Sequence, residues 1–265
     1  MVRVIVSGAP GKMGQRVVAL LQTDPEFELV GALVHRDHDA LGRDVGEIAG
    51  GRPLGVVVTH EIEPLLPGAD VIIDFSIAAA TLTYIPKIAA YGKAMVIGTT
   101  GFTKPQQEEI ARYSAGMRCF VAPNMSLGIN VLFQVLRQVA TALGGDYDVE
   151  IIEAHHRTKV DAPSGTALQA AAIIADALGR DLAEVVVYGR QGAVGKRSDT
   201  EIGIQSIRAG DIVGEHTVIF GGPGERLEFV HRSQSRDNFA RGALRAAKWV
   251  CQQSAGLYSM EDLLR

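Results

Sequence analysis

The feature that most constrains this sequence is a glycine-rich turn between a strand-like and a helix-like run near its start. The run Val4-Ile5-Val6-Ser7 leads into Gly8-Ala9-Pro10-Gly11-Lys12-Met13-Gly14, and residues 13–22 then place apolar side chains on one helical face. Glycine suits such a turn because the backbone must approach a pyrophosphate, which free N–H groups at the helix N-terminus bind. The spacing departs from G-x-G-x-x-G, so a turn without a ligand is the alternative. We expect cofactor contacts at Gly8, Ala9, Pro10, Gly11, Lys12 and Met13.

The first half of the chain alternates short apolar runs with helical patterns. Strands are predicted at 2–7, 29–34, 55–59, 71–75, 94–98 and 119–122, with helices between them, such as 13–22 and 105–114. Such alternation is typical of βαβ units. The fold class is therefore α/β, with a Rossmann-like doubly wound parallel sheet.

The pattern changes after Asn124 and predicts a second, α+β domain. Helices are expected at 129–143 and 166–178, and strands at 149–154, 204–208, 216–220 and 227–232, separated by glycine-containing turns that suggest a mixed or antiparallel sheet. A helix at 239–250 is expected to return to the first domain. The predicted domains are 1–126 with 236–265 for the dinucleotide, and 127–235 for substrate binding and oligomerisation, with crossings at 124–128 and 233–238.

Loops after three other strands complete the expected cofactor site. His35 and Arg36 stand where NAD-preferring folds place a carboxylate for the ribose hydroxyls, and Arg36 suits a 2′-phosphate, which favours NADPH with NADH also accepted. A solvated arginine neutralised by Asp37 or Asp39 is the alternative. Further contacts are expected at strand ends, where ligands of open parallel sheets bind: Gly98, Thr99, Thr100, Ala122, Pro123, Asn124 and Met125.

The stretch Glu153 to Thr166 predicts chemistry on a small dicarboxylate. Hydride reduction of a C=N or conjugated C=C bond leaves negative charge that a nearby acid must neutralise, and His155 fits this role, with Lys159 as a second cationic donor. Ser164, Gly165 and Thr166 precede an apolar helix and form an anion site at its start. The sequence thus favours His155 and Lys159 as catalytic residues.

This stretch allows three other interpretations. His155 and His156 as metal ligands, with Glu153 or Asp161, are disfavoured because adjacent strand residues face opposite ways and no metal-type spacing is present, so no metal is expected. Ser164 to Thr166 as a helix cap is compatible with an anion site. In the third interpretation, Lys159 is a solvated charge on a loop.

Composition excludes several partners. A net charge of −4 over 265 residues gives no attraction to nucleic acid or acidic membranes. The two cysteines, Cys119 and Cys251, lie in apolar surroundings and are expected to be reduced thiols. The chain opens directly into a strand pattern, and no apolar run approaches the length of a membrane span, so we expect a cytoplasmic protein.

At these motifs the sequence resembles the 4-hydroxy-tetrahydrodipicolinate reductases, formerly dihydrodipicolinate reductases, of the bacterial diaminopimelate and lysine pathway. The resemblance covers essentially the whole chain and is most specific at Glu153 to Ala167, with further matches at 8–14, 96–102 and 208–216. It implies NAD(P)H-dependent reduction of ring C4 of dehydrated 4-hydroxy-tetrahydrodipicolinate to tetrahydrodipicolinate. It places the acid on His155, the second donor on Lys159 and substrate contacts on His156, Gly165 and Thr166.

The resemblance also implies a homotetramer formed through the second sheet and closure of the domains over ligands. Two positions depart from the family's pattern: His35 stands where many members carry an acidic residue, and Met125 where an aromatic residue is common. Two other functions stay open from the residues alone. One is a non-catalytic NADP-binding redox sensor, and the other is a different two-domain amino or imino acid dehydrogenase.

Overall fold

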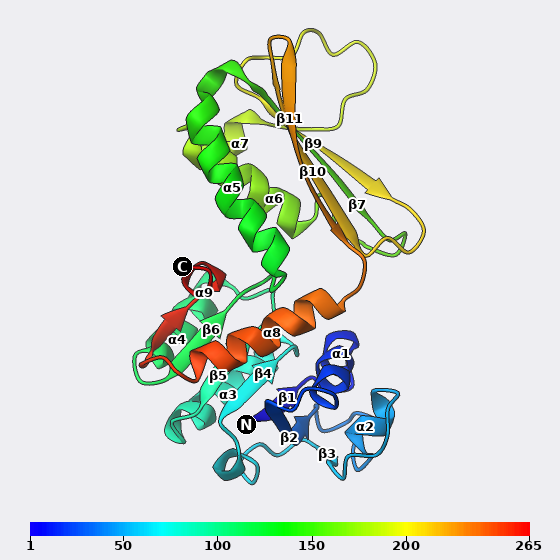
Figure 1. Cartoon of the computed structure of the whole chain (residues 1–265), viewed down its shortest axis with the longest axis vertical. Coiled ribbons are helices and arrows are strands. Elements are labelled where there is room, and N and C mark those ends of the chain that lie inside the picture. Colours follow the sequence, from blue (N-terminus) through cyan, green and yellow to red (C-terminus); the bar gives the residue numbers. More distant parts are fainter. The chain divides into compact units, whose positions relative to one another are not determined.

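The computed structural model describes residues 1–265, which form two compact units (Figure 1). The first unit contains Met1–Leu127 and Arg236–Arg265, and the second contains Gly128–Ser235. The helix expected to return to the first domain is confirmed: α8 (Asp237–Val250) packs against α1 and strands β4, β5 and β6. The assignment of the cofactor to the first unit and the substrate to the second stays a prediction.

The first unit is built on a seven-stranded parallel sheet in the order β12-β6-β5-β4-β1-β2-β3. This order is that of a dinucleotide-binding sheet extended by one strand, and it confirms the predicted Rossmann-like fold. The strands are β1 (Val2–Ser7), β2 (Phe27–Leu33), β3 (Val58–Thr59), β4 (Val71–Asp74), β5 (Ala94–Ile97), β6 (Arg118–Val121) and β12 (Gly256–Tyr258).

Helices cover both faces of this sheet, so its central strands are apolar on both sides. Val4 and Val6 pack with α1 (Lys12–Leu21) and α8, whereas Ile5 packs on the other face with α3 (Ala78–Ala90) and α4 (Lys104–Ser114). The remaining elements are short: α2 (Val45–Ile48), the 3₁₀ turn η1 (Leu66–Gly68) and α9 (Met260–Leu263).

The second unit has a five-stranded sheet in the order β11-β10-β7-β9-β8, and its mixed pairing agrees with the mixed or antiparallel sheet predicted from the sequence. β7 (Asp148–His155) runs parallel to β9 (Ile202–Arg208), which also pairs with β8 (Val186–Tyr188) in parallel. β10 (Gly214–Gly222) runs antiparallel to both β7 and β11 (Glu225–Ser233). The helices α5 (Leu127–Leu143) and α6 (Gly165–Ala177) pack on one face of this sheet and form the core of the unit with it (Figure 1). Two short elements, η2 (Gly144–Asp146) and α7 (Leu182–Val185), complete the unit.

The structure corrects two expectations. Only Val58–Thr59 of the strand predicted at 55–59 pairs with β2 in the sheet. Gly55 turns the chain with a φ of +72°, and Val57 forms an isolated antiparallel bridge with Asp44 instead. The segment Leu127–Asp146 is 20 residues long with a mean hydropathy of 1.2, and so by length and composition alone it does reach the dimensions of a membrane span. Its apolar character has a local cause, since Ile129, Leu132, Phe133, Leu136 and Ala140 lie in the core of the second unit.

Candidate active site

The loops expected to bind a dinucleotide lie along one edge of the first sheet. Each follows the carboxyl end of a parallel strand: Gly8 follows β1, Phe75 follows β4, Gly98 follows β5 and Ala122 follows β6. β1 and β4 are neighbours at the point where the strand order reverses, which is where open α/β sheets bind ligands.

Gly8 and Gly14 hold the turn in a shape that only glycine permits. Gly8 has a φ of +74°, and a Cβ atom there would lie 2.3 Å from the carbonyl oxygen of Phe75. A Cβ atom at Gly14 would lie 2.2 Å from the carbonyl oxygen of Gly8. Gly11 caps α1 without a side chain, so the first-turn N–H groups of Lys12 and Met13 point out of the helix without intrahelical partners. This cradle fits the pyrophosphate of a dinucleotide.

A buried carboxylate joins the loops after β4 and β5. Asp74 is fully buried and accepts hydrogen bonds from the hydroxyls of Ser76 at 2.6 Å, Thr81 at 2.5 Å and Thr99 at 2.9 Å. The Thr99 hydroxyl oxygen also accepts a hydrogen bond from the Ser76 N–H at 2.9 Å. These bonds fix the two loops to each other. The buried Thr99 hydroxyl is therefore occupied by contacts within the protein, whereas Thr100 is exposed to solvent.

The other predicted cofactor residues differ in exposure. Arg36 is exposed and forms no ion pair with Asp37 or Asp39, and the His35 ring packs edge-on against His38 with centroids 5.1 Å apart. Met125 is 1% exposed and belongs to the core of the first unit. A cofactor contact by Met125 would therefore use its backbone.

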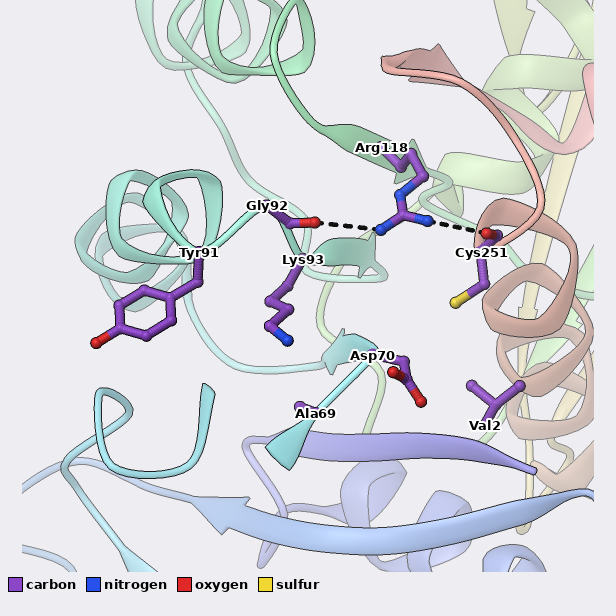
Figure 2. Close-up of a pocket in the computed structure, with 8 residues that line it drawn as sticks. All are labelled: Val2, Ala69, Asp70, Tyr91, Gly92, Lys93, Arg118 and Cys251. Carbon is purple, nitrogen blue, oxygen red and sulfur yellow. Dashed lines mark hydrogen bonds between the residues drawn. The ribbon is translucent and has the colours of Figure 1, made fainter. Parts of the chain in front are cut away.

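A cavity of about 310 Å³ lies at the opposite, amino-terminal edge of the same sheet (Figure 2). Asp70, Lys93 and Arg118 line it, each at or just before the start of a strand. The Arg118 guanidinium donates hydrogen bonds to the carbonyl oxygens of Cys251 at 2.9 Å and Gly92 at 3.1 Å. Arg118 thus links the chain after α3 to the chain after α8, and this cavity is remote from the glycine-rich turn.

In the second unit, one face of the sheet changes from apolar to ionisable side chains toward one end. Every second side chain of β7 points to the face covered by helices: Val149, Ile151, Glu153 and His155. Of these, Val149 and Ile151 belong to the apolar core. Directly across the sheet from Glu153 lie Ser206 on β9 and His216 on β10, and His231 on β11 follows next in the row.

Glu153 is the centre of this cluster. Its side chain is fully buried and its Oε2 lies 2.6 Å from His155 Nδ1. The Arg208 guanidinium donates to both carboxylate oxygens, at 2.9 and 2.8 Å. Burial alone would raise the pKa of Glu153, but hydrogen bonds from Arg208 and His155 outweigh it and lower that pKa to about 2. Glu153 is therefore an anion.

His155 has a depressed pKa because burial penalises its charged form, with the opposing effect of Glu153 second in size. The ring is 12% exposed and packs edge-on against His216, with centroids 5.2 Å apart. A Cβ atom on Gly214 would lie 3.1 Å from His155 Nε2, so the glycine leaves room at that nitrogen.

His216 connects this cluster to the start of α6. Its Nε2 lies 3.1 Å from Ser164 Oγ, and this same Oγ caps α6 by accepting the Ala167 N–H. Burial, first of all, lowers the pKa of His216 to about 3, so its ring is neutral. Ser164 is only 2% exposed, so an anion at this helix start would meet the N–H groups of Gly165 and Thr166 rather than the Ser164 hydroxyl.

The other predicted donors lie on the loop between β7 and α6. Lys159 Nζ pairs with Asp161 at 2.7 Å, and His156 Nδ1 lies 2.8 Å from the Thr158 hydroxyl. Arg208 donates to the carbonyl oxygen of Asp161 at 2.6 Å, which fixes this loop to β9. No group of three or more His, Cys, Asp or Glu side chains has the arrangement of a metal site.

Sequence reasoning gave no role to Glu153 as the partner of His155, nor to Arg208 or His216. Their positions depend on strand register, since Glu153 and His216 are neighbours only through the antiparallel pairing of β7 and β10. The one available signal was the alternation along β7, which puts Glu153 and His155 on the same face.

A Rossmann-like unit with a glycine-rich turn after β1, joined to a second unit with a mixed sheet and a buried Glu153–His155–Arg208 cluster, is the architecture of a two-domain pyridine-nucleotide-dependent oxidoreductase. Family models agree over both units. Residues 2–125 match the family described as dihydrodipicolinate reductase, N-terminus, and residues 128–264 match dihydrodipicolinate reductase, C-terminus. The chain belongs to the dihydrodipicolinate reductase family, an NAD(P)H-dependent family of lysine and diaminopimelate biosynthesis.

Individual relatives agree with this assignment. The chain is 54% identical to the 4-hydroxy-tetrahydrodipicolinate reductase of Syntrophobacter fumaroxidans, over 100% of this chain and 99% of the relative. It is 52% identical to that of Syntrophus aciditrophicus, over 100% and 98%. Among solved structures, dipicolinate-bound dihydrodipicolinate reductase from Paenisporosarcina sp. TG-14 is similar, with a TM-score of 0.75 and 29% identity over 98% of this chain and 97% of that chain.

Proposed function

We propose that this chain reduces dehydrated 4-hydroxy-tetrahydrodipicolinate at ring C4 to tetrahydrodipicolinate, and that His155 provides the proton. The observation that carries the proposal is the position of His155 beside the N-terminus of α6. Glu153 accepts hydrogen bonds from both His155 Nδ1, at 2.6 Å, and the N–H of Ser164, at 3.2 Å. An acid and an anion site are thus held by one buried carboxylate.

Substrate binding and proton transfer follow from these residues. The N–H groups of Gly165 and Thr166 would bind one carboxylate, because a helix N-terminus favours negative charge. Lys159 and His156 would bind the other, with Lys159 exchanging Asp161 for the substrate. The bound dianion raises the pKa of His155 against the effect of burial and charges the ring when substrate arrives.

A reduced nicotinamide nucleotide, when bound, supplies the hydride. The proton from His155 then neutralises the negative charge that the hydride leaves on the conjugated ring system. Lys159 is the second donor in this scheme. We assign the nucleotide contacts to loops at the carboxyl edge of the first sheet: Gly8, Ala9, Pro10, Gly11, Lys12, Met13, His35, Arg36, Gly98, Thr99, Thr100, Ala122, Pro123, Asn124 and Met125.

We also propose a preference for NADPH, with NADH accepted. The exposed, unpaired guanidinium of Arg36 after β2 supports it, since a charge-assisted hydrogen bond contributes about 1.5 to 3 kcal/mol, or roughly tenfold to a hundredfold in affinity. Arg36→Ala should weaken NADPH by that factor and leave NADH nearly unchanged, as measured by fluorescence titration, with the exposed Arg52→Ala as control. Equal losses for both nucleotides would end the 2′-phosphate assignment.

A cytoplasmic homotetramer is part of the same proposal. Ile207 on β9 and Val230 on β11 are 47% and 46% exposed, which supports an interface on the second sheet. Sedimentation velocity distinguishes a tetramer from smaller species, and a monomer at micromolar concentration would contradict this part.

The activity is tested by mixing the chain with a dihydrodipicolinate synthase, pyruvate and aspartate semialdehyde and following NADPH oxidation. The wild type should oxidise NADPH only when all components are present, and His155→Gln should lose turnover by roughly a hundredfold or more while its NADPH affinity stays within about twofold. His60→Gln in the first unit is the matched control. Full turnover by His155→Gln would remove His155 from the acid role, and a redox sensor or another dehydrogenase would show no oxidation that depends on the synthase product.

A further inference from the structure

Glu153 is unusual because a fully buried carboxylate receives hydrogen bonds from Arg208, His155, Ser206 and the Ser164 N–H. Its Oε1 accepts from Arg208 Nη2 at 2.8 Å and from the Ser164 N–H at 3.2 Å. Its Oε2 accepts from Arg208 Nη1 at 2.9 Å and from His155 Nδ1 at 2.6 Å. Every partner is a donor, as an ionised carboxylate requires.

This arrangement determines the tautomer of His155. A carboxylate without a proton can only accept, so Nδ1 must carry a hydrogen and the neutral ring must leave Nε2 unprotonated. Nε2 is the nitrogen beside Gly214, which has no side chain to crowd it, since a Cβ atom there would lie 3.1 Å away. The ring therefore takes up and gives away its catalytic proton at Nε2 only.

We infer that Glu153, held by the guanidinium fork of Arg208, is the positioning residue that directs the acid proton of His155 to Nε2. This inference rests on the proposed function in that His155 is the acid. Arg208 keeps Glu153 ionised and fixes its plane through two parallel bonds, and it also holds the loop of Lys159 through the carbonyl oxygen of Asp161 at 2.6 Å.

The charged and titratable groups around His155 come from every element that packs on it. Glu153 lies on its own strand, Lys159 and Asp161 on the following loop, Arg208 on β9, and His216 on β10 with His231 behind it. Glu153 is the one with a direct hydrogen bond to the ring. A change in Glu153 should therefore alter the ring more than a change in any of the others.

Glu153→Gln gives a definite expectation because one orientation of the amide faces fewer fixed donors than the other. An NH₂ group at the Oε1 position would face Arg208 and the Ser164 N–H, neither of which can accept. At the Oε2 position the NH₂ group would face one fixed donor, Arg208 Nη1, together with His155 Nδ1, which can become an acceptor. His155 should then carry its hydrogen on Nε2 and resist protonation, as a neutral ring in the wrong tautomer.

The test is ¹⁵N NMR of histidine-labelled full-length protein, with the His155 resonances assigned by their loss in His155→Gln. The wild type should show Nδ1 protonated and Nε2 unprotonated in the neutral ring, and Glu153→Gln should exchange the two. Glu150→Gln is the matched control, since Glu150 lies on the same strand and also pairs with an arginine, Arg190 at 2.7 Å. It should leave the His155 signals unchanged.

Kinetics give the second measurement. Glu153→Gln should lower kcat by roughly a hundredfold to ten-thousandfold with KM changed less than about threefold, and Glu150→Gln should retain kcat. Arg208→Lys, which keeps the charge but removes the fork, should give an intermediate loss and serves if Glu153→Gln does not fold. A wild-type ring protonated on Nε2, or a tautomer unchanged in Glu153→Gln, overturns the inference. A tautomer exchange with full turnover instead refutes His155 as the acid, and the two failures are thus distinguishable.

Discussion

The neutral, buried imidazole of His216 should make the second unit lose stability as the pH falls from neutral toward acid. Burial lowers the pKa of His216 to about 3, whereas an unfolded histidine titrates near its model value of 6.5. Between these values only the unfolded state binds the proton. The stabilisation is therefore complete above pH 6.5 and is lost progressively as the pH falls toward 3.

The magnitude follows from the linkage relation, in which each pH unit of such a window costs about 1.4 kcal/mol. From pH 7 to pH 5 the loss due to His216 should be about 2 kcal/mol. Glu153 adds nothing in this range, because its pKa is lowered from 4.5 to about 2 and its contribution is lost only at more acid pH. His155 and His231 also have lowered pKa values, so they too reduce stability as the pH falls, and they do so in every variant that retains them.

The assay compares the wild type with His216→Gln, which cannot titrate but can still accept the Ser164 hydroxyl. Amide hydrogen exchange of the β7 and β10 peptides, corrected for intrinsic rates, gives the local free energy of opening at pH 7 and pH 5. The pH-dependent loss should be about 2 kcal/mol smaller in His216→Gln. Fluorescence of Trp249 on α8 reports the first unit and should show no difference. An identical pH dependence in both proteins would refute the argument.

Two glycine substitutions test the two halves of the site. Gly8→Ala should destabilise the first unit more than Gly42→Ala and should abolish nucleotide binding. Both glycines have a positive φ, at 74° and 77°, but only at Gly8 would the added Cβ lie 2.3 Å from a backbone atom, the carbonyl oxygen of Phe75. Unfolding followed by Trp249 fluorescence checks this, and equal losses would contradict it. Gly214→Ala should lower turnover while nucleotide affinity is unchanged, because its Cβ would lie 3.1 Å from His155 Nε2, whereas Gly221→Ala on the same strand meets open space. Equal turnover for these two variants would show that room at Nε2 is not required.

Local pattern was sufficient for most of the fold. The strands at β1 and β4 to β6, and the hairpin of β10 and β11, follow from apolar runs between turn residues. Helix α3 was not predicted individually, because Pro86 lies inside it and Ile77 gives no side-chain cap. β8 and β12 have three residues each and no recognisable period, and they are strands only because longer neighbours pair with them.

The candidate site was predictable only where its residues are close in sequence. His155 ends β7, Lys159 lies on the loop that follows and Gly165 begins α6, so their chemistry could be predicted together. The residues around His155 that come from other strands could not be predicted, because Arg208 and His216 lie 53 and 61 residues after His155 in the chain. They lie beside Glu153 only through the pairing of β7 with β9 and β10. Register of this kind is set by tertiary packing and is invisible to local periodicity.

The central claim is that His155 protonates a dicarboxylate bound at the start of α6, and a crystal structure with pyridine-2,6-dicarboxylate tests it most directly. The account predicts one carboxylate group within hydrogen-bond distance of the N–H groups of Gly165 and Thr166, with His155 Nε2 directed at the bound ring. A ligand bound elsewhere, or one that leaves His155 Nε2 facing only solvent, would contradict it.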